Sequence, residues 1–190
     1  MATYYFVRHG TAYPPEAGQQ DFDRALSLEG TVLVEKMAKK LEGIPFDAMI
    51  LSPARRSRET ATILRPTLRQ TYYHELYPLM AYEPDMIKKT REIERGTLAD
   101  CSDSELKEAI MHYGKERALH IDDLVHKRIK QANPDVLIIG HGIYLQAIAY
   151  NISFNQHSRN LAMYTKLDEG DCLKIDTIRH FESTHIPAKG

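Results

Sequence analysis

The sequence has little of what marks secreted, membrane or strongly charged proteins. Its only cysteines, Cys101 and Cys172, form no CxxC pair, so we expect two unreactive thiols in a reducing cytoplasm, with no disulfide framework and no zinc site. No apolar run approaches the ~20 residues of a membrane span. The opening MATYYFVRHG lacks the basic and apolar regions of an export signal. These absences favour a cytoplasmic protein without a membrane partner.

The chain also lacks an excess of charge of either sign. It carries 25 basic and 26 acidic residues, so no overall field would hold it on nucleic acid or on an anionic membrane. Any basic site must therefore be local. With 190 residues, 43% apolar and 27% charged, the composition is that of an ordinary globular protein, and we expect a single domain over residues 1–190.

Short β-branched or aromatic runs alternate with helical patterns along the chain. Strands are expected at residues 3–7, 48–51, 71–73 and 136–139, with two more within 163–178 around a turn at Glu169-Gly170-Asp171. This alternation predicts an α/β fold: a three-layer α/β/α sandwich with a mostly parallel central sheet and helices on both faces.

Helix signals fall between these strands. An apolar stripe at Leu28, Val32, Met37 and Leu41 predicts one helix, which Gly43 and Pro45 close. Ser52-Pro53 predicts an N-cap with proline at the first helical position, for a helix that runs to about Leu64. Further helices are expected at residues 85–94, from Ser102 to about Gln131 behind a Ser-x-x-Glu capping signal, and at residues 144–150.

Three of the expected strands end in unusual polar residues. These are Arg8-His9, the segment from Ser52 to Arg56, and His141. Ligands of such sheets bind beyond the carboxyl ends of the strands, so we expect these side chains to converge. Singly, each has a plainer explanation, such as a structural histidine. Together, two arginines and two histidines form a pocket for a phosphate dianion, in which a neutral imidazole can attack phosphorus and form a covalent intermediate.

The same residues resemble the histidine phosphatase superfamily, also called phosphoglycerate mutase-like, in which an Arg-His-Gly triplet ends the first strand. Residues 23–30, DRALSLEG, resemble the family's D-R-x-L-[ST]-x-x-G, and residues 52–61, SPARRSRETA, resemble its S-P-x-x-R-[AS]-x-[QE]-T-A. Gly140-His141-Gly142 resembles the segment of its second catalytic histidine. Four motifs in the right order, between residues 3 and 150, make the resemblance specific.

The resemblance implies a role for each matching residue. His9 would be the phosphorylated nucleophile, while Arg8, Arg56 and His141 would bind the phosphoryl oxygens. Thr11 and Ser57 are further candidate donors to the substrate. Arg55 and Arg58 are expected to point elsewhere, because neighbours one and two positions away leave a helix in other directions. The chemistry calls for no metal and no other cofactor.

The proton donor is where the sequence departs from the family pattern. Many members carry a glutamate after the third strand, which protonates an alcohol leaving group. Glu75 is the nearest match, with Glu83 and Asp85 as rivals, and none stands in the L-N-E-R-x-Y-G context of the mutases. A solvent-facing loop carboxylate explains Glu75 equally well, so a site without a carboxylate acid also stays open.

Three functions are compatible with these patterns. The chain lacks the long insertions of the mutases, and Glu75-Leu76-Tyr77-Pro78 resembles the E-L-x-P of small SixA-type phosphohistidine phosphatases. The leading interpretation is therefore a phosphatase of a phosphohistidine protein or a phosphomonoester. The alternatives are a mutase or small-metabolite phosphatase, and an inactive phosphate-binding scaffold. The histidines at 112, 120 and 126 are expected on a solvated helix face, because they lack the i,i+4 spacing of a metal pair.

Overall fold

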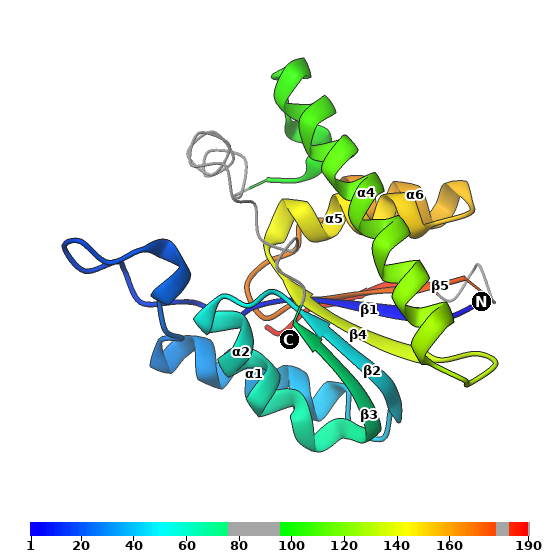
Figure 1. Cartoon of the computed structure of the whole chain (residues 1–190). Coiled ribbons are helices and arrows are strands. Elements are labelled where there is room, and N and C mark those ends of the chain that lie inside the picture. Colours follow the sequence, from blue (N-terminus) through cyan, green and yellow to red (C-terminus); the bar gives the residue numbers. More distant parts are fainter. Residues whose placement is uncertain (76–95, 178–182, 190) are drawn as a thin grey trace.

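Strands and helices alternate along the chain and build a layered α/β fold (Figure 1). The computed structural model describes residues 1–75, 96–177 and 183–189. Within them, six strands form one sheet in the order β3-β2-β4-β1-β5-β6. The strands are β1 Thr3–Arg8, β2 Phe46–Leu51, β3 Leu68–Glu75, β4 Asp135–Gly140, β5 Cys172–Asp176 and β6 Thr184–Ile186. The pairings among β1 to β4 are parallel, and β5 and β6 extend the sheet antiparallel beyond β1.

Helices cover both faces of the sheet, as expected. They are α1 Leu28–Lys40, α2 Arg55–Leu64, α4 Ser104–Arg128, α5 Gly142–Ile152 and α6 Gln156–Tyr164. Tyr5 and Val7 of β1 belong to the core under α1 and α2, whereas the alternate residues Tyr4 and Phe6 pack with α4, α5 and α6. The two helical layers are visible on opposite sides of the sheet in Figure 1. The three-layer α/β/α sandwich is therefore confirmed, around a mixed sheet.

The start of α2 differs from the prediction. The helix begins at Arg55 after Ala54, which makes no side-chain capping bond, instead of at Ser52-Pro53. The Ser52 hydroxyl lies 3.0 Å from Nε2 of His141 and 3.3 Å from the Ala54 amide. The serine that the pattern assigned to a helix cap thus connects two strand ends.

The inward face of α1 also differs from the expected stripe. The helix itself is confirmed, and Ser27 caps it by accepting from the Gly30 amide. Leu28 and Val32 are exposed, however, and the buried residues of α1 are Gly30, Leu33, Val34 and Met37. Gly30 packs against the backbone of Thr11, where a Cβ would collide with the Thr11 carbonyl. This close backbone contact, which an apolar pattern does not mark, sets the rotation of α1.

Predictions for the later segments were partly wrong. Two strands were expected within residues 163–178, but the described part of this range, residues 163–177, holds one strand, β5, after the expected turn, and Met163 belongs to α6. Neither α6 nor β6 was predicted, because α6 is short and polar and β6 has only three residues. The helix α4 ends at Arg128, short of Gln131, and Asp103 is its N-cap in place of Ser102. The helix expected at residues 85–94 lies outside the described residues.

Both cysteines are buried, and neither forms a disulfide. Burial raises the pKa of the Cys172 thiol, which fits the expectation of an unreactive side chain. In the part of the chain that the structure describes, no helix combines the length and apolarity needed to cross a membrane.

Gly114 lies in the interior of α4, where glycine costs about 1 kcal/mol relative to alanine. The packing of α4 on α5 explains it, because a Cβ at this position would stand 2.6 Å from the carbonyl carbon and oxygen of Ala147. The two helix backbones can therefore approach this closely only at a glycine.

We expect Gly114→Ala to lower the free energy of unfolding by about 1–3 kcal/mol, because overpacking outweighs the gain in helix propensity. Chemical denaturation would measure the change. Lys115→Ala, at the exposed neighbouring position, is the matched control and should stay within about 0.5 kcal/mol of the unsubstituted protein. A stabilised Gly114→Ala variant would contradict this account of the α4–α5 contact.

Candidate active site

Three polar segments meet at the carboxyl ends of β1, β2 and β4. Because β1 pairs with β4 as far as Arg8 and Gly140, His9 and His141 both lie one residue beyond the last paired positions. Ser52 follows β2, and its amide donates to a carbonyl of β4 over 2.9 Å. The register of the sheet thus places these polar residues side by side, as the sequence predicted.

The imidazole of His9 is held in one orientation. Its Nδ1 lies 2.8 Å from the carbonyl oxygen of Gly10. A carbonyl oxygen only accepts, so Nδ1 carries the hydrogen and Nε2 keeps its lone pair. Nε–H of Arg56 donates to this Nε2 over 3.0 Å. The unprotonated nitrogen of His9 therefore faces a guanidinium.

Arg56, in the first turn of α2, connects the two histidines. Its Nη2 lies 3.2 Å from Nδ1 of His141. Arginine only donates, so this Nδ1 accepts, and the hydrogen of His141 lies on Nε2, from which it is donated to Ser52 Oγ over 3.0 Å. The two rings stand edge to face, with centroids 5.0 Å apart. One arginine thus donates to the unprotonated nitrogen of both imidazoles.

Both histidines are strongly disfavoured as cations. Burial lowers the pKa of His9 well below its ordinary value of 6.5, and the charges of Arg56 and Arg8 lower it further. Burial and Arg56 have the same effect on the pKa of His141. The neutral imidazole, which is the nucleophilic form, is therefore present throughout the neutral pH range.

Arg8 lies beside His9 and contacts the loop that follows α6. Its Nη1 donates to the carbonyl oxygen of Leu167 over 2.9 Å, and its Nη2 lies 3.9 Å from the carboxylate of Glu169. Glu169 also accepts from the Thr11 hydroxyl over 2.9 Å. Two of the sequence-predicted substrate ligands therefore share a carboxylate that the sequence analysis did not single out.

The remaining predicted residues have different outcomes. Ser57 lies next to Arg56, and its buried hydroxyl has no hydrogen-bond partner in the described part of the chain. Arg55 and Arg58 are exposed, as expected. Glu75 ends β3, paired with the last residue of β2, but its side chain lies outside what the structure describes. Glu83 and Asp85 lie outside the described residues altogether, so the proton donor stays a prediction.

Asp21 is a member of this site that the sequence analysis missed. Its Oδ2 lies 2.8 Å from Nη2 of Arg56, and its backbone carbonyl accepts from Nη1. Arg24 binds the other carboxylate oxygen over 2.8 Å. Burial opposes ionisation, but the two arginines hold the pKa of Asp21 below its ordinary value of 3.8. The sequence offered only a weak signal: a carboxylate three residues before Arg24, in a loop without periodicity.

Other motif residues stabilise the backbone segments that carry the site. The carboxylate of Glu59 accepts from the Leu26 amide over 2.6 Å, and the Thr60 hydroxyl accepts from the Gly10 amide over 3.3 Å. A Cβ on Gly10 would stand 2.5 Å from the carbonyl oxygen of Gly30. These contacts fasten the loop after β1 and the start of α1 to α2, so the motifs encode the frame of the pocket as well as its reactive groups.

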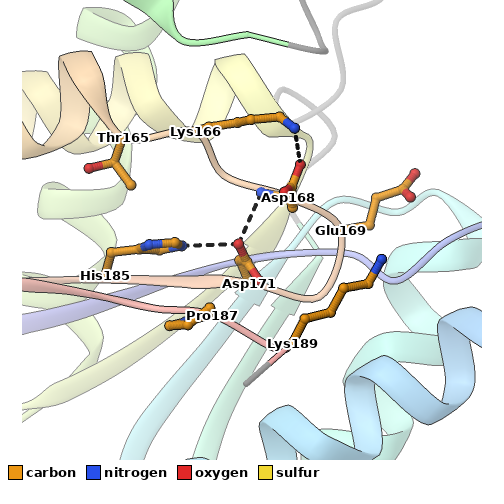
Figure 2. A pocket seen from close by; sticks show the side chains of 8 residues that line it. All are labelled: Thr165, Lys166, Asp168, Glu169, Asp171, His185, Pro187 and Lys189. Atoms are coloured by element: carbon orange, nitrogen blue, oxygen red, sulfur yellow. Dashed lines mark hydrogen bonds and ion pairs between the residues drawn. The ribbon is translucent and has the colours of Figure 1, made fainter.

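Figure 2 shows the side chains that line a cavity of about 390 Å³, Glu169 among them. The cavity adjoins the site through Glu169, which also contacts Arg8. In its wall, Nε2 of His185 lies 3.0 Å from the carboxylate of Asp171. Asp171 also accepts from the backbone amides of Asp168 and Ala188. The cavity is lined by Thr165, Lys166, Asp168, Glu169, Asp171, His185, Pro187 and Lys189. The backbone of this loop is bonded to the end of β1, where the Arg8 amide donates to the Asp171 carbonyl oxygen over 3.0 Å and the Gly170 amide donates to the Arg8 carbonyl oxygen over 3.1 Å.

Family comparison agrees with this arrangement. The chain matches the model of the histidine phosphatase superfamily (branch 1) over residues 4–170 and belongs to that superfamily. A curated relative, an uncharacterized protein of Picosynechococcus sp., is 37% identical over 62 residues. That match spans 32% of this chain and 38% of the relative.

Solved structures share the fold at low sequence identity. A SixA protein histidine phosphatase in complex with tungstate has a TM-score of 0.63 at 15% identity, with 98% of this chain and 97% of that chain covered. A phosphoserine phosphatase of Entamoeba histolytica has a TM-score of 0.62 at 13% identity, covering 97% and 95%. A phosphoglycerate mutase of Bacillus anthracis has a TM-score of 0.62 at 17% identity, covering 92% and 87%. The phosphoglycerate mutase-like fold is thus confirmed.

The lowered pKa values of the two histidines link folding to pH. When the chain unfolds between about pH 6.5 and 5, each histidine takes up a proton that the folded state excludes. The free energy of unfolding should therefore fall as the pH drops below 6.5, by up to about 1.4 kcal/mol per pH unit for each histidine. Asp21 contributes only at lower pH, because its stabilisation is lost as the pH falls below 3.8.

We expect His141→Gln to make this dependence less steep between pH 7 and 5, because one buried group no longer gains a proton on unfolding. Denaturant titrations at several pH values would measure it. Leu119→Gln, at an exposed position of α4 that carries no titratable group, is the control and should leave the slope unchanged. An unchanged slope in His141→Gln would show that His141 is not held neutral.

Proposed function

We propose that this protein is a phosphatase that forms a covalent phosphohistidine at Nε2 of His9. One observation carries the proposal: the lone pair of this nitrogen faces Arg56, whose guanidinium also reaches His141. An imidazole held neutral beside a permanent cation suits attack on a phosphate dianion, because the cation attracts the phosphoryl oxygens that the nucleophile must approach.

The reaction consumes one water and proceeds in two displacements. In the first, the Nε2 lone pair forms the N–P bond while the bond from phosphorus to the leaving group breaks. The leaving group takes the electron pair and a proton, which comes from Glu75 for an ester or from solvent for a phosphoramidate. In the second, water attacks phosphorus and gives up a proton to the same acid or to solvent, while the N–P bond breaks and its electron pair returns to Nε2. Inorganic phosphate then leaves, and His9 is neutral again. Nδ1–H keeps its bond to the Gly10 carbonyl, which orients the ring in both steps.

Arg8, Arg56 and His141 are the proposed ligands of the phosphoryl oxygens. Arg56 would exchange its bond to His9 for bonds to the substrate, which frees the Nε2 lone pair for attack. Ser57, with a buried hydroxyl that lacks a partner among the described residues, is a further donor. Thr11 is the weaker candidate, because Glu169 already accepts its hydroxyl hydrogen.

The proposed substrate is a phosphohistidine protein or a phosphomonoester in the cytoplasm. A phosphoramidate suits the site because its nitrogen leaving group is readily protonated, so its cleavage depends less on an enzyme acid. For an ester, Glu75 is the proposed acid. It is the last residue of β3, and it therefore lies at the carboxyl ends of the strands, where the histidines also lie. The likeness in fold to a SixA protein histidine phosphatase supports the first substrate class.

A labelled phosphodonor should transfer acid-labile label to the protein, and His9→Ala should abolish the transfer. Turnover should fall by several orders of magnitude, as is usual when one member of a catalytic unit is removed. The turnover of Arg56→Ala should be reduced nearly as much. Arg55→Ala, at the exposed neighbouring position, is the matched control and should retain activity. Label that persists in His9→Ala would refute the nucleophile.

Substrate preference and the proton donor are tested together with Glu75→Gln. We expect the substitution to slow hydrolysis of alkyl phosphate esters roughly 100-fold or more. Phosphohistidine and p-nitrophenyl phosphate, whose leaving groups need little protonation, should be affected much less. Steady-state rates on this panel would decide between an acid at residue 75 and none, since equal effects on all substrates exclude a proton-donor role.

A further inference from the structure

The two sides of the Arg56 guanidinium have different partners. Its Nε–Nη2 edge faces the histidines, with His9 Nε2 at 3.0 Å and His141 Nδ1 at 3.2 Å. Its Nη1–Nη2 end faces Asp21, which offers a carboxylate oxygen at 2.8 Å and its backbone carbonyl. Asp21 thus binds the planar guanidinium at the end away from His9, and this bond fixes the direction of its Nε–Nη2 edge.

The ion pair with Asp21 is important because the guanidinium of Arg56 is buried. The Arg56 side chain is only 7% exposed, and the two imidazoles that it contacts are neutral. A buried guanidinium needs an anion nearby, because neutral acceptors do not offset the loss of hydration. Asp21 supplies this anion before any substrate is bound.

Asp21 is itself held in place independently of Arg56. Its second carboxylate oxygen binds Arg24, and the side chain of the next residue, Phe22, lies under the Arg58 guanidinium at 6.0 Å. Further along the segment, the Glu59 carboxylate holds the Leu26 amide. These three contacts hold the segment that carries Asp21, so its carboxylate keeps a fixed position beside Arg56.

We propose that Asp21 is the positioning residue of the phosphoryl pocket: as an anion, it holds Arg56 so that the Nε–Nη2 edge is presented to an incoming phosphoryl group. The proposal rests on the proposed function, which makes Arg56 a phosphoryl ligand. On substrate binding the histidine-facing edge exchanges partners, while the end bound to Asp21 keeps its own. A proton-donor role does not fit Asp21, because two arginines hold it ionised.

Asp21→Asn and Asp21→Ala test the role, with Asp23→Asn as the matched control. Asp23 belongs with Asp21 to one short 3-10 helix, Asp21–Asp23, and is exposed, so its substitution removes an equal charge away from Arg56. Calorimetry with inorganic phosphate and with orthovanadate measures oxyanion binding without turnover, and KM and kcat are measured separately. Thermal melting identifies any variant that does not fold.

We expect Asp21→Asn to weaken oxyanion binding roughly tenfold and to raise KM more than it lowers kcat, since the amide keeps the shape but loses a charge-assisted bond. Asp21→Ala should weaken oxyanion binding further. Added formate, a free carboxylate, should partly restore the activity of this variant without stimulating the unsubstituted protein. Asp23→Asn should bind as the unsubstituted protein does.

Oxyanion binding that is unchanged or tighter in folded Asp21→Asn would overturn the proposal, because Asp21 would then be a bystander or a competitor for Arg56. If Asp21→Ala does not fold, Asp21→Asn decides alone. These outcomes are separate from the fate of the proposed function, since oxyanion binding is measured whether or not His9 carries a phosphoryl group during turnover.

Discussion

The pocket depends on one interaction, the bridging of His9 and His141 by the guanidinium of Arg56. It requires that β1 and β4 end in register, that α2 begins two residues after Pro53, and that the loop before α1 brings Asp21 to the outer end of the same guanidinium. A chain with nearly equal numbers of basic and acidic residues thereby gathers cationic side chains at the carboxyl ends of its strands. Their charges, together with burial, keep both imidazoles neutral.

The parts that the sequence revealed are those with a local signal. Continuous β-branched runs marked β1 and β4, and the polar residues that interrupt them, Arg8-His9 and His141, could be assigned to one edge because parallel strands share a carboxyl end. Arg56 was distinguished from Arg55 and Arg58 by helical spacing and by the motif that it resembles. The four residues expected to share the pocket do lie together in the structure.

What the sequence missed is decided by contacts between distant segments. The Ser52 hydroxyl had the pattern of a helix cap, yet it meets a histidine 89 positions away. Asp21 lies in a segment without apolar periodicity, and only the fold shows that it contacts Arg56. The inward face of α1 is set by the backbone contact at Gly30, and α6 and β6 are too short or too polar to produce a pattern.

The position of β1 in the middle of the sheet has a consequence for how the chain is made. This strand leaves the ribosome before its neighbours β4 and β5, which begin only at Asp135 and Cys172. The strand that leads to His9 therefore lacks both of its sheet neighbours until the chain has been synthesised as far as β4. Such long-range pairing is slow and leaves hydrophobic surface uncovered, so the nascent segment that carries β1 is exposed to aggregation until its neighbours are made.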